Sequence, residues 1–390
     1  MTQTSDNQNQ AARENGKTMQ SASRLIAILS LCWLMILGSV ALIFLIPRQP
    51  VAMGDATDAL LLSKPFPLDG ELASSFTVVG TTLVRIEDEG LALLDASGRE
   101  QSFIGFPYRE SRVITMKEGL IVTPVRGSGF MVVTPDLSTY EIDAPETVHG
   151  ADYRDGQLLT FGPSSQNRIV VALYEIAAET NRRTLSFPSA QWPVRVAFVP
   201  DGQFFDVVLL DLSNGTLSTR LQRYDYACNQ VMDLLYDEED LFPGIGHLAD
   251  RESILYNDRA IMLTDTDSGE VRVTAMPGSI EHVDLMGGRY AMLSEKEGKS
   301  QFSIVLPSVT RGDHILFEPE LSDQIICFAL ARSGSLALAA SDGELLVYDM
   351  NTGALIVRMS IESDVRRILA LDDRSFVVIS ADDAIIAIVR

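Results

Sequence analysis

Residues 324–360 read QIICFALARSGSLALAASDGELLVYDMNTGALIVRMS. Three turn signals, Ser333-Gly334, Asp342-Gly343 and Asn351-Thr352-Gly353, separate four short apolar runs in this stretch. Glycine after a small polar residue supplies the positive φ that a tight turn needs, and strands are typically about 5–6 residues long. The stretch therefore predicts four antiparallel strands in about 40 residues, which is the size of one β-propeller blade.

Proline recurs at the spacing of this unit through most of the chain. Proline has no N–H and cannot continue a strand ladder, so it suits the point where one blade ends and the link to the next begins. One interval of 55 residues is followed by one of 34, which indicates a long blade beside a short one or a displaced boundary near 237–246. The prolines, which lie a mean of 42 residues apart, are Pro67, Pro107, Pro145, Pro188, Pro243, Pro277 and Pro319.

The two ends of the repeat fit a closed ring. Residues 58–64 supply one spare strand, and residues 364–390 contain only three strand-like runs. Pairing the spare strand with the incomplete unit would leave no open edge between the first and last blades. We expect an all-β, eight-bladed β-propeller over residues 58–390, closed by the N-terminal strand 58–64, with a seven-bladed ring as the alternative.

The N-terminal part predicts a membrane anchor. Residues 1–24 are polar and without periodicity, which is typical of a disordered tail. Residues 25–46 carry no charge, and as a helix they would span about 33 Å, enough for a hydrocarbon core of about 30 Å. A cleaved signal peptide, whose apolar core is usually only ~7–15 residues, is the alternative. Residues 47–57 form a linker.

Charge gives the expected orientation and excludes some partners. Close to the predicted transmembrane helix, three basic residues precede it (Arg13, Lys17, Arg24) and two follow it (Arg48, Lys64). We therefore expect a single-pass cell-membrane protein with a cytoplasmic N-terminus and an extracytoplasmic propeller. The first 48 residues hold four of the 31 basic and two of the 53 acidic residues, which leaves a net charge of −24 on residues 49–390. The electrostatic field of this negative charge repels nucleic acid and argues against a phosphate-rich ligand.

The sequence contains no motif of a known catalytic, cofactor or metal site. The four histidines lack ligand-like spacing, and no nucleophile elbow or phosphate-binding glycine loop occurs. We therefore predict no catalytic residue, cofactor or metal ligand, and the sequence favours a non-enzymatic protein. The alternative is an extracytoplasmic hydrolase or lyase with a site at the propeller axis, which would need polar side chains converging on the inner strands with shifted pKa values.

Aromatic residues beside the link prolines are the candidate partner-binding residues. Tyr108 follows Pro107, Trp192 precedes Pro193, and Phe242 precedes Pro243. Tyrosine, tryptophan and phenylalanine are favoured anchors of protein interfaces. The competing interpretation is that these rings cover the seams between blades. We expect a scaffold or binding module that engages a protein or an envelope polymer through its loops, with the membrane contacted by residues 25–46.

The turn Asp349–Gly353, which follows Leu-Leu-Val-Tyr in a unit of about 40 residues, resembles the repeats of WD-repeat and PQQ-type (quinoprotein-like) propellers. The layout of one N-terminal span and then a propeller is similar to that of single-pass, membrane-anchored propeller proteins of Gram-positive bacteria. This resemblance implies a propeller at the cell surface. The tryptophan-docking motif of the quinoprotein repeat is missing, because Trp192 is the only tryptophan after the predicted span, so no quinone cofactor is expected.

Overall fold

The computed structural model describes residues 59–390 except 69, 165, 167, 178–181, 237–239, 277, 287, 307–313 and 318–323. For residues 286 and 314–317 only the backbone is described. The predicted tail, transmembrane helix and linker lie outside these residues. Within the described part, no helix is both long and apolar enough to cross a membrane.

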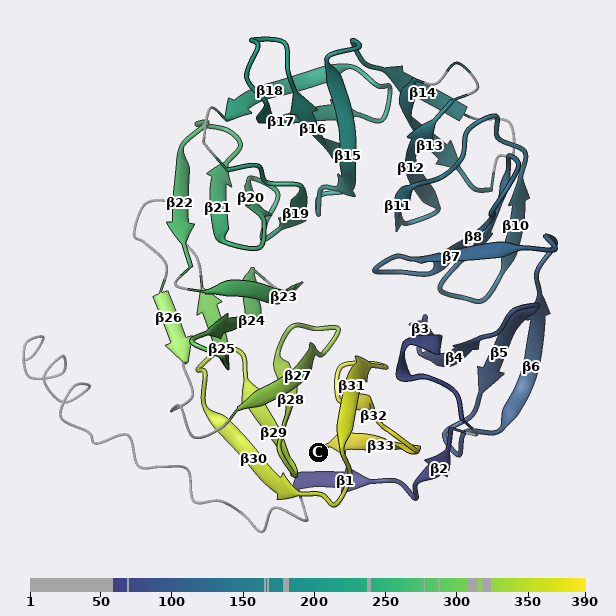
Figure 1. Ribbon diagram of the computed structural model, residues 1–390, viewed down its shortest axis with the longest axis vertical. Coiled ribbons are helices and arrows are strands. Elements are labelled where there is room, and N and C mark those ends of the chain that lie inside the picture. The colour runs from purple at the N-terminus through teal and green to yellow at the C-terminus, as the bar shows by residue number, and fades with distance from the viewer. Residues whose placement is uncertain are drawn as a thin grey trace, which may run out of the picture. The chain divides into compact units, whose positions relative to one another are not determined.

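The described chain folds into eight antiparallel sheets, seven of four strands and one of five (Figure 1). Blades 1 to 3 consist of β3 (Phe76–Val79), β4 (Thr82–Ile86), β5 (Gly90–Leu94), β6 (Glu100–Gly105); β7 (Ser111–Thr115), β8 (Leu120–Pro124), β9 (Phe130–Val133), β10 (Thr139–Ile142); and β11 (Gly150–Arg154), β12 (Gln157–Pro163), β13 (Ile169–Glu175), β14 (Arg182–Ser186). Blades 4 to 6 consist of β15 (Gln191–Phe198), β16 (Phe204–Asp211), β17 (Ser218–Asp225), β18 (Gln230–Tyr236); β19 (Gly244–His247), β20 (Glu252–Tyr256), β21 (Ala260–Asp265), β22 (Val271–Ala275); and β23 (Ser279–Met286), β24 (Arg289–Lys296), β25 (Lys299–Leu306), β26 (His314–Phe317). Blade 7 consists of β27 (Ile325–Leu330), β28 (Leu336–Ser341), β29 (Glu344–Asp349) and β30 (Leu355–Ser360).

Blade 8 joins the two ends of the propeller. Three of its strands are β31 (Val365–Ala370), β32 (Ser375–Ser380) and β33 (Asp383–Val389), and the fourth is β1 (Leu60–Leu62). Leu60 pairs with Val389 in antiparallel register. The short strand β2 (Phe66–Pro67) also pairs with β33, and the 3₁₀ turn η1 (Ala73–Ser75) leads into blade 1. The ring is therefore eight-bladed, as the sequence predicts, and the seven-bladed alternative is wrong.

Turn chemistry in the deciding stretch explains why its strands end where they do. The Asp349 carboxylate accepts hydrogen bonds from the main-chain N–H groups of Asn351 and Thr352, at 2.6 and 3.1 Å, and Gly353 has φ = 69°. An Asx turn followed by a left-handed glycine reverses the chain between β29 and β30. Of the predicted link prolines that the structure describes, Pro107, Pro145, Pro188 and Pro243 each lie between the outer strand of one blade and the inner strand of the next. Pro67 lies in the short strand β2, between β1 and β3. The long and short intervals correspond to blade 4, with strands of seven or eight residues, and blade 5, with strands of four to six.

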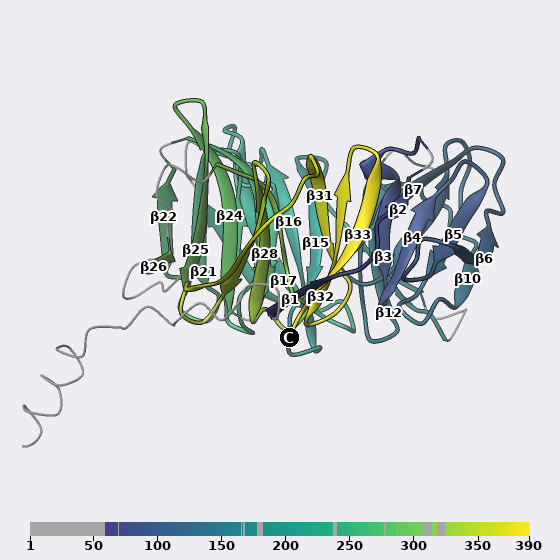
Figure 2. The same cartoon turned by 90° about the horizontal axis from the view of Figure 1, so that it is seen from below.

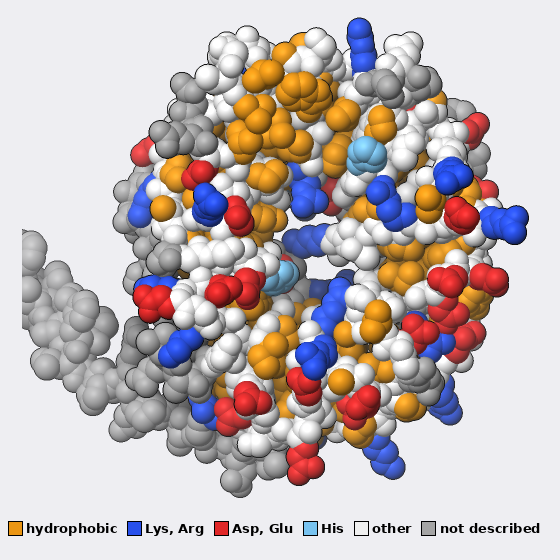
Figure 3. Space-filling view, in the orientation of Figure 1, with side chains coloured by type: hydrophobic (Ala, Val, Ile, Leu, Met, Phe, Trp, Pro, Cys, Tyr) orange, Lys and Arg blue, Asp and Glu red, His pale blue; other side chains and the backbone are white. Residues whose placement is uncertain are grey.

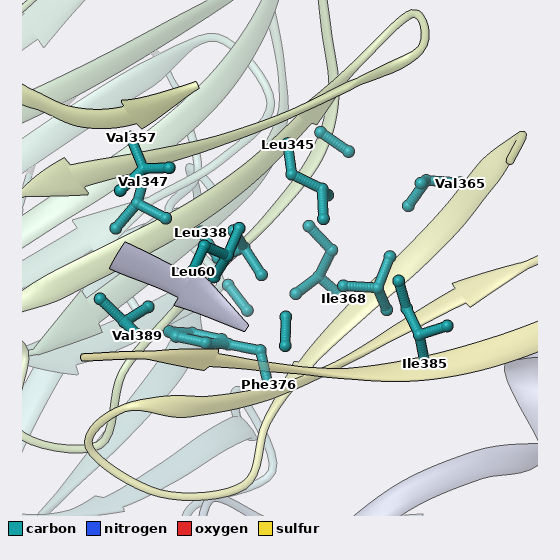
Figure 4. Packing of buried hydrophobic residues seen from close by; sticks show 14 of the residues in the cluster. Leu60, Leu338, Leu345, Val347, Val357, Val365, Ile368, Phe376, Ile385 and Val389 are labelled. Atoms are coloured by element: carbon teal, nitrogen blue, oxygen red, sulfur yellow. The ribbon is translucent and has the colours of Figure 1, made fainter. Parts of the chain in front are cut away.

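The hydrophobic core is divided among the seams of the ring. Eight clusters of buried side chains are present, and each combines residues of two adjacent blades. Figure 4 shows the seam of blades 7 and 8, where Leu60 of β1 packs beside Leu338, Phe376 and Val389. Seen from the side, the strands run between the two faces of the ring (Figure 2). Stability therefore depends on contacts between neighbouring blades, including the contact that joins the first and last strands.

Candidate functional site

The inner strands of the eight blades surround a central channel. One cavity of about 460 Å³ is lined by residues of blades 2 to 6, and a second of about 640 Å³ by residues of blades 6 to 8. Asp284 lines both, so the two cavities adjoin. Figure 3 shows that Lys and Arg side chains, with a His, surround the central opening. The channel is thus lined by charged groups and not only by apolar ones.

Two channel arginines tie neighbouring blades together. Arg154 at the end of β11 donates from Nη1 to the carbonyl oxygen of Val199, at 2.9 Å. Arg367 of β31 donates from Nη1 to the carbonyl oxygens of Phe76 and Ala73, at 2.8 and 3.2 Å. In each case the guanidinium reaches main-chain oxygens of the next blade round the ring. These two side chains consequently have a structural role.

Two carboxyl groups in the channel wall also join neighbouring blades, as hydrogen-bond acceptors instead of donors. Asp152 of β11 accepts a hydrogen bond through Oδ2 from the N–H of Phe198, at 2.8 Å, and Asp284 of β23 accepts one through Oδ2 from the N–H of Leu330, at 3.3 Å. Each carboxylate therefore accepts a hydrogen bond from the inner strand of the next blade round the ring. Burial raises the pKa of both carboxyl groups, although the main-chain donors and the positive charge of Lys117 oppose the shift.

Lys117 lines the same cavity as Asp152 and Asp284. Its residue belongs to the turn between β7 and β8 in blade 2, and its charge lowers the pKa of Asp152 in blade 3 and of Asp284 in blade 6. Blades 2 and 6 face each other across a ring of eight. The cavity that Lys117 lines therefore extends between opposite blades of the ring.

The structure separates the three predicted partner-binding residues. Phe242 is fully buried in the seam between blades 4 and 5, as the competing interpretation requires. Tyr108 is half-buried and packs against the seam of blades 1 and 2. Burial and the nearby carboxylates of Glu141 and Asp143 raise the pKa of its hydroxyl. Trp192 is exposed on β15. The three side chains do not form one surface, and the involvement of Tyr108 and Trp192 in binding stays a prediction.

Trp192 has two exposed apolar neighbours at one end of blade 4. Trp192, Leu212 and Leu217 keep 38%, 41% and 42% of their surface exposed. Trp192 pairs with Leu210 across β15 and β16, and the N–H of Leu212 donates to the carbonyl oxygen of Ala190 at 2.9 Å, so the turn between β16 and β17 lies beside the start of β15. Figure 3 shows hydrophobic side chains gathered over this blade. We call Trp192, Leu212 and Leu217 the blade-4 patch.

A polar network holds the strands beneath the blade-4 patch. The Asp211 carboxylate accepts hydrogen bonds from the side chains of Gln191 and Arg220, and Arg220 also contacts Asp233 at 2.7 Å. Burial alone would raise the pKa of Asp211, but the hydrogen bonds from Ser213, Arg220 and Gln191 lower it. The network links β15, β16, β17 and β18. It therefore fixes the positions of the strands that carry the patch.

The channel residues were not predicted from the sequence. One signal in the sequence could have indicated them, because the first strand of several units carries Arg, Asp or His where a buried strand would be apolar: Asp152, Arg195, His282 and Arg367. In the part of the chain that the structure describes, no group of three or more His, Cys, Asp and Glu side chains could hold a metal ion.

Comparison with known proteins supports the fold. No protein-family model and no curated protein matches the chain. Among solved structures, the computationally designed Ika8 protein has a TM-score of 0.57 at 13% identity over 83% of this chain and 99% of its own. BamB from Moraxella catarrhalis has a TM-score of 0.50 at 10% identity over 84% and 97%. The β-propeller domain of Cps50 (Swd1) from Myceliophteria thermophila has a TM-score of 0.44 at 10% identity over 83% and 99%. The neighbours thus include both WD40 and BamB (PQQ-like) propellers, and at these identities the likeness concerns the fold alone.

Proposed function

We propose that this protein is a non-enzymatic binding module that holds a partner protein against the blade-4 patch. The observation that carries the proposal is the exposed Trp192 with Leu212 and Leu217 beside it. Large aromatic side chains dominate the energetics of protein interfaces, and contiguous exposed apolar groups mark interaction surfaces. Of the other two predicted residues, Phe242 is buried in a seam, and Tyr108 is half-buried against one and stays a predicted contact.

The patch is supported rigidly, which favours binding. Trp192 lies on β15, paired with Leu210 of β16 just before a β-bulge at Pro193–Arg195. Leu212 and Leu217 border a turn in which the N–H of Ser213 donates to the Asp211 carboxylate at 2.7 Å. A surface that is already ordered loses less conformational entropy on association. The surrounding charge of the propeller is strongly negative, so a partner with a basic rim around an apolar centre would associate fastest.

The proposal includes a membrane tether and an extracytoplasmic location. Residues 25–46 are uncharged and long enough to span a bilayer, and the 11-residue linker would reach no further than about 36–40 Å. The propeller would therefore act close to the membrane surface, on a partner of the same membrane or of the envelope beside it.

We expect protease added to intact cells to remove a tag placed after Arg390, which follows the last strand at the surface of the ring. The reason is that a single N-terminal span with a cytoplasmic N-terminus leaves the whole propeller outside. Immunoblotting of the tag measures the loss, and a cytoplasmic protein in the same cells is the control. A tag that survives on intact cells and disappears only after lysis would contradict the proposed location.

Trp192→Ala should reduce partner capture roughly 30-fold, the effect of losing about 2 kcal/mol at an interface anchor. A photo-crosslinking amino acid at position 212, beside Trp192 at the same end of blade 4, would trap the bound partner in cells as an adduct of discrete mass. The yield of that adduct, measured with and without Trp192→Ala, tests the proposal. The melting temperature of Trp192→Ala should stay close to that of the wild type.

Two controls make this experiment decisive. Ile356→Ala removes an equally exposed apolar side chain from the outer strand β30 of blade 7 and should leave the adduct unchanged. Tyr108→Ala should instead lower the melting temperature, because Tyr108 packs in a seam. Equal adduct yield in wild type and Trp192→Ala would refute the patch. A heterogeneous adduct that polysaccharide-degrading enzymes collapse would make the partner an envelope polymer instead of a protein.

The hydrolase or lyase alternative has some support from the channel. Polar side chains converge there, and the pKa values of Asp152 and Asp284 are raised. Both carboxyl groups, however, accept main-chain hydrogen bonds that join adjacent blades. A structural role accounts for them without a reaction, so the binding module is the better-supported function.

A further inference from the structure

Asn214 differs from the other asparagines that the structure describes. Its side-chain amide forms no hydrogen bond with any described residue, and the next residue is glycine. Asn229, by contrast, donates through Nδ2 to the Asp225 carboxylate at 2.9 Å. The side-chain amide of Asn257 takes part in three hydrogen bonds, and Asn351 is followed by threonine. Within the described part of the chain, Asn214 alone combines an unbonded side chain with a following glycine.

The turn around Asn214 leaves the next main-chain nitrogen open to approach. Residues 212–217, between β16 and β17, are all exposed. Gly215 has φ = 84°, and no atom lies within 4 Å of the place that a Cβ would occupy there. One hydrogen bond restrains its N–H, which donates to the carbonyl oxygen of Leu212 at 3.0 Å. In an exposed turn such a bond opens at a small cost in free energy, because water takes the place of the acceptor.

We propose that Asn214 is a site of spontaneous deamidation, and that the carboxylate formed there weakens partner binding at the blade-4 patch. The main-chain nitrogen of Gly215 loses its proton and bonds to Cγ of Asn214, while the bond from Cγ to Nδ2 breaks and ammonia leaves. Water then opens the cyclic succinimide at either carbonyl carbon, which gives aspartate or isoaspartate. The chain thus gains one water and releases one ammonia, and no oxidant or reductant takes part.

The effect on binding rests on the proposed function of the blade-4 patch. Asn214 lies in the same turn as Leu212 and Leu217, two of the three residues of the patch. A carboxylate beside them would be covered by a bound partner, and removing an unpaired charge from water is costly. Isoaspartate also adds a methylene group to the main chain and so shifts the turn that carries the two leucines. Partner capture therefore declines as the protein ages.

Peptide mapping of the full-length protein in detergent, after incubation at neutral and at mildly alkaline pH, tests the modification. Asn214 should deamidate roughly 10-fold faster than Asn229 and Asn257, since their amides must first lose hydrogen bonds. The rate should rise with pH, because the attacking nitrogen has to lose its proton. Gly215→Ala should slow the reaction, because the added methyl group crowds that nitrogen.

Two further measurements complete this test. Enzymatic methylation of isoaspartate identifies the rearranged product in the peptide that contains Asn214. The peptide with Asn15 and Gly16, the other Asn-Gly pair of the sequence, shows whether the incubation was long enough. An Asn214 that stays intact while Asn15 is lost, or equal rates at Asn214, Asn229 and Asn257, would overturn the proposal.

Asn214→Asp and Asn214→Gln, which place a charged and a neutral side chain at the same position, test the effect on binding. With the photo-crosslinking residue at position 212, the adduct yield should be roughly 10-fold lower in Asn214→Asp than in Asn214→Gln. An equal or higher yield in Asn214→Asp would overturn the effect on binding. If Trp192→Ala keeps the wild-type yield, the proposed function fails instead. The peptide map needs no partner, so the two failures are distinguishable.

Discussion

Replacing Arg223 with Met should lower the free energy of unfolding by about 3–5 kcal/mol, the usual cost of removing one partner from a buried ion pair. Arg223 and Asp206 are both buried, and the guanidinium binds the carboxylate through two hydrogen bonds of 2.7 and 2.9 Å. Burial alone would lower the pKa of Arg223, but the Asp206 carboxylate raises it. Methionine would leave that carboxylate in the seam without its counter-ion.

Arg223 also joins blade 4 to blade 5. Its Nη1 donates to the carbonyl oxygen of Asp250 at 2.9 Å and to the Oγ1 of Thr266 at 3.0 Å, both in turns of blade 5. The His247 ring lies 3.8 Å from Asp206, and burial lowers its pKa, with the Arg223 charge adding to that lowering. The variant therefore loses a charge partner and two contacts across the seam at once.

Urea unfolding at neutral pH, followed by circular dichroism, measures this effect. The double variant Asp206→Leu with Arg223→Met is the matched control, because removing both charges leaves no unpaired ion and should cost less than the single change. A single variant within about 1 kcal/mol of the wild type would show that the pair adds little to the seam.

The second large effect is expected at the closure of the ring. Leu60→Ala should lower the free energy of unfolding by about 2–5 kcal/mol, as large-to-small changes in cores do. Leu60 is 1% exposed and packs in the seam of blades 7 and 8, whereas Leu62, on the same short strand, is 37% exposed. Losing the Leu60 side chain weakens the longer of the two N-terminal strands, β1 and β2, that pair with β33 of the last blade.

Leu62→Ala is the matched control for this variant. It makes the same chemical change on the same strand, and its cost should stay within about 1 kcal/mol because little buried surface is lost. Equal destabilisation by the two variants would mean that β1 contributes through its main-chain pairing with β33 and not through Leu60. The same urea unfolding experiment distinguishes these cases.

The fold was predictable because its signals are local. The Asx turn at Asp349–Gly353 and the link prolines act within a few residues of themselves, so their spacing revealed the size of the blades. The uneven spacing around Pro243 also had a local cause, the longer strands of blade 4. The eighth blade was complete once the spare strand near residue 60 paired with the three-stranded unit at the C-terminal end.

The candidate sites were less predictable because their environment comes from other blades. Phe242 and Trp192 look alike in the sequence, each an aromatic residue beside a proline. Phe242 is covered by side chains of blade 5, and Trp192 remains open, so burial alone separates them. Lys117 and Asp284 are far apart in the sequence and carry no motif that connects them.

By itself, the sequence determined the repeat length, the turns between strands and the strongly acidic character of the propeller, since each depends on residue type and short-range spacing. It left the number of blades at eight or seven, and the pairing of β1 with β33 decided for eight. Only the tertiary structure decided which aromatic side chain is exposed and which charged side chains meet in the channel. Those properties depend on the packing of blades about 40 residues apart or more, and on closure of the ring, which places blades 2 and 6 opposite each other.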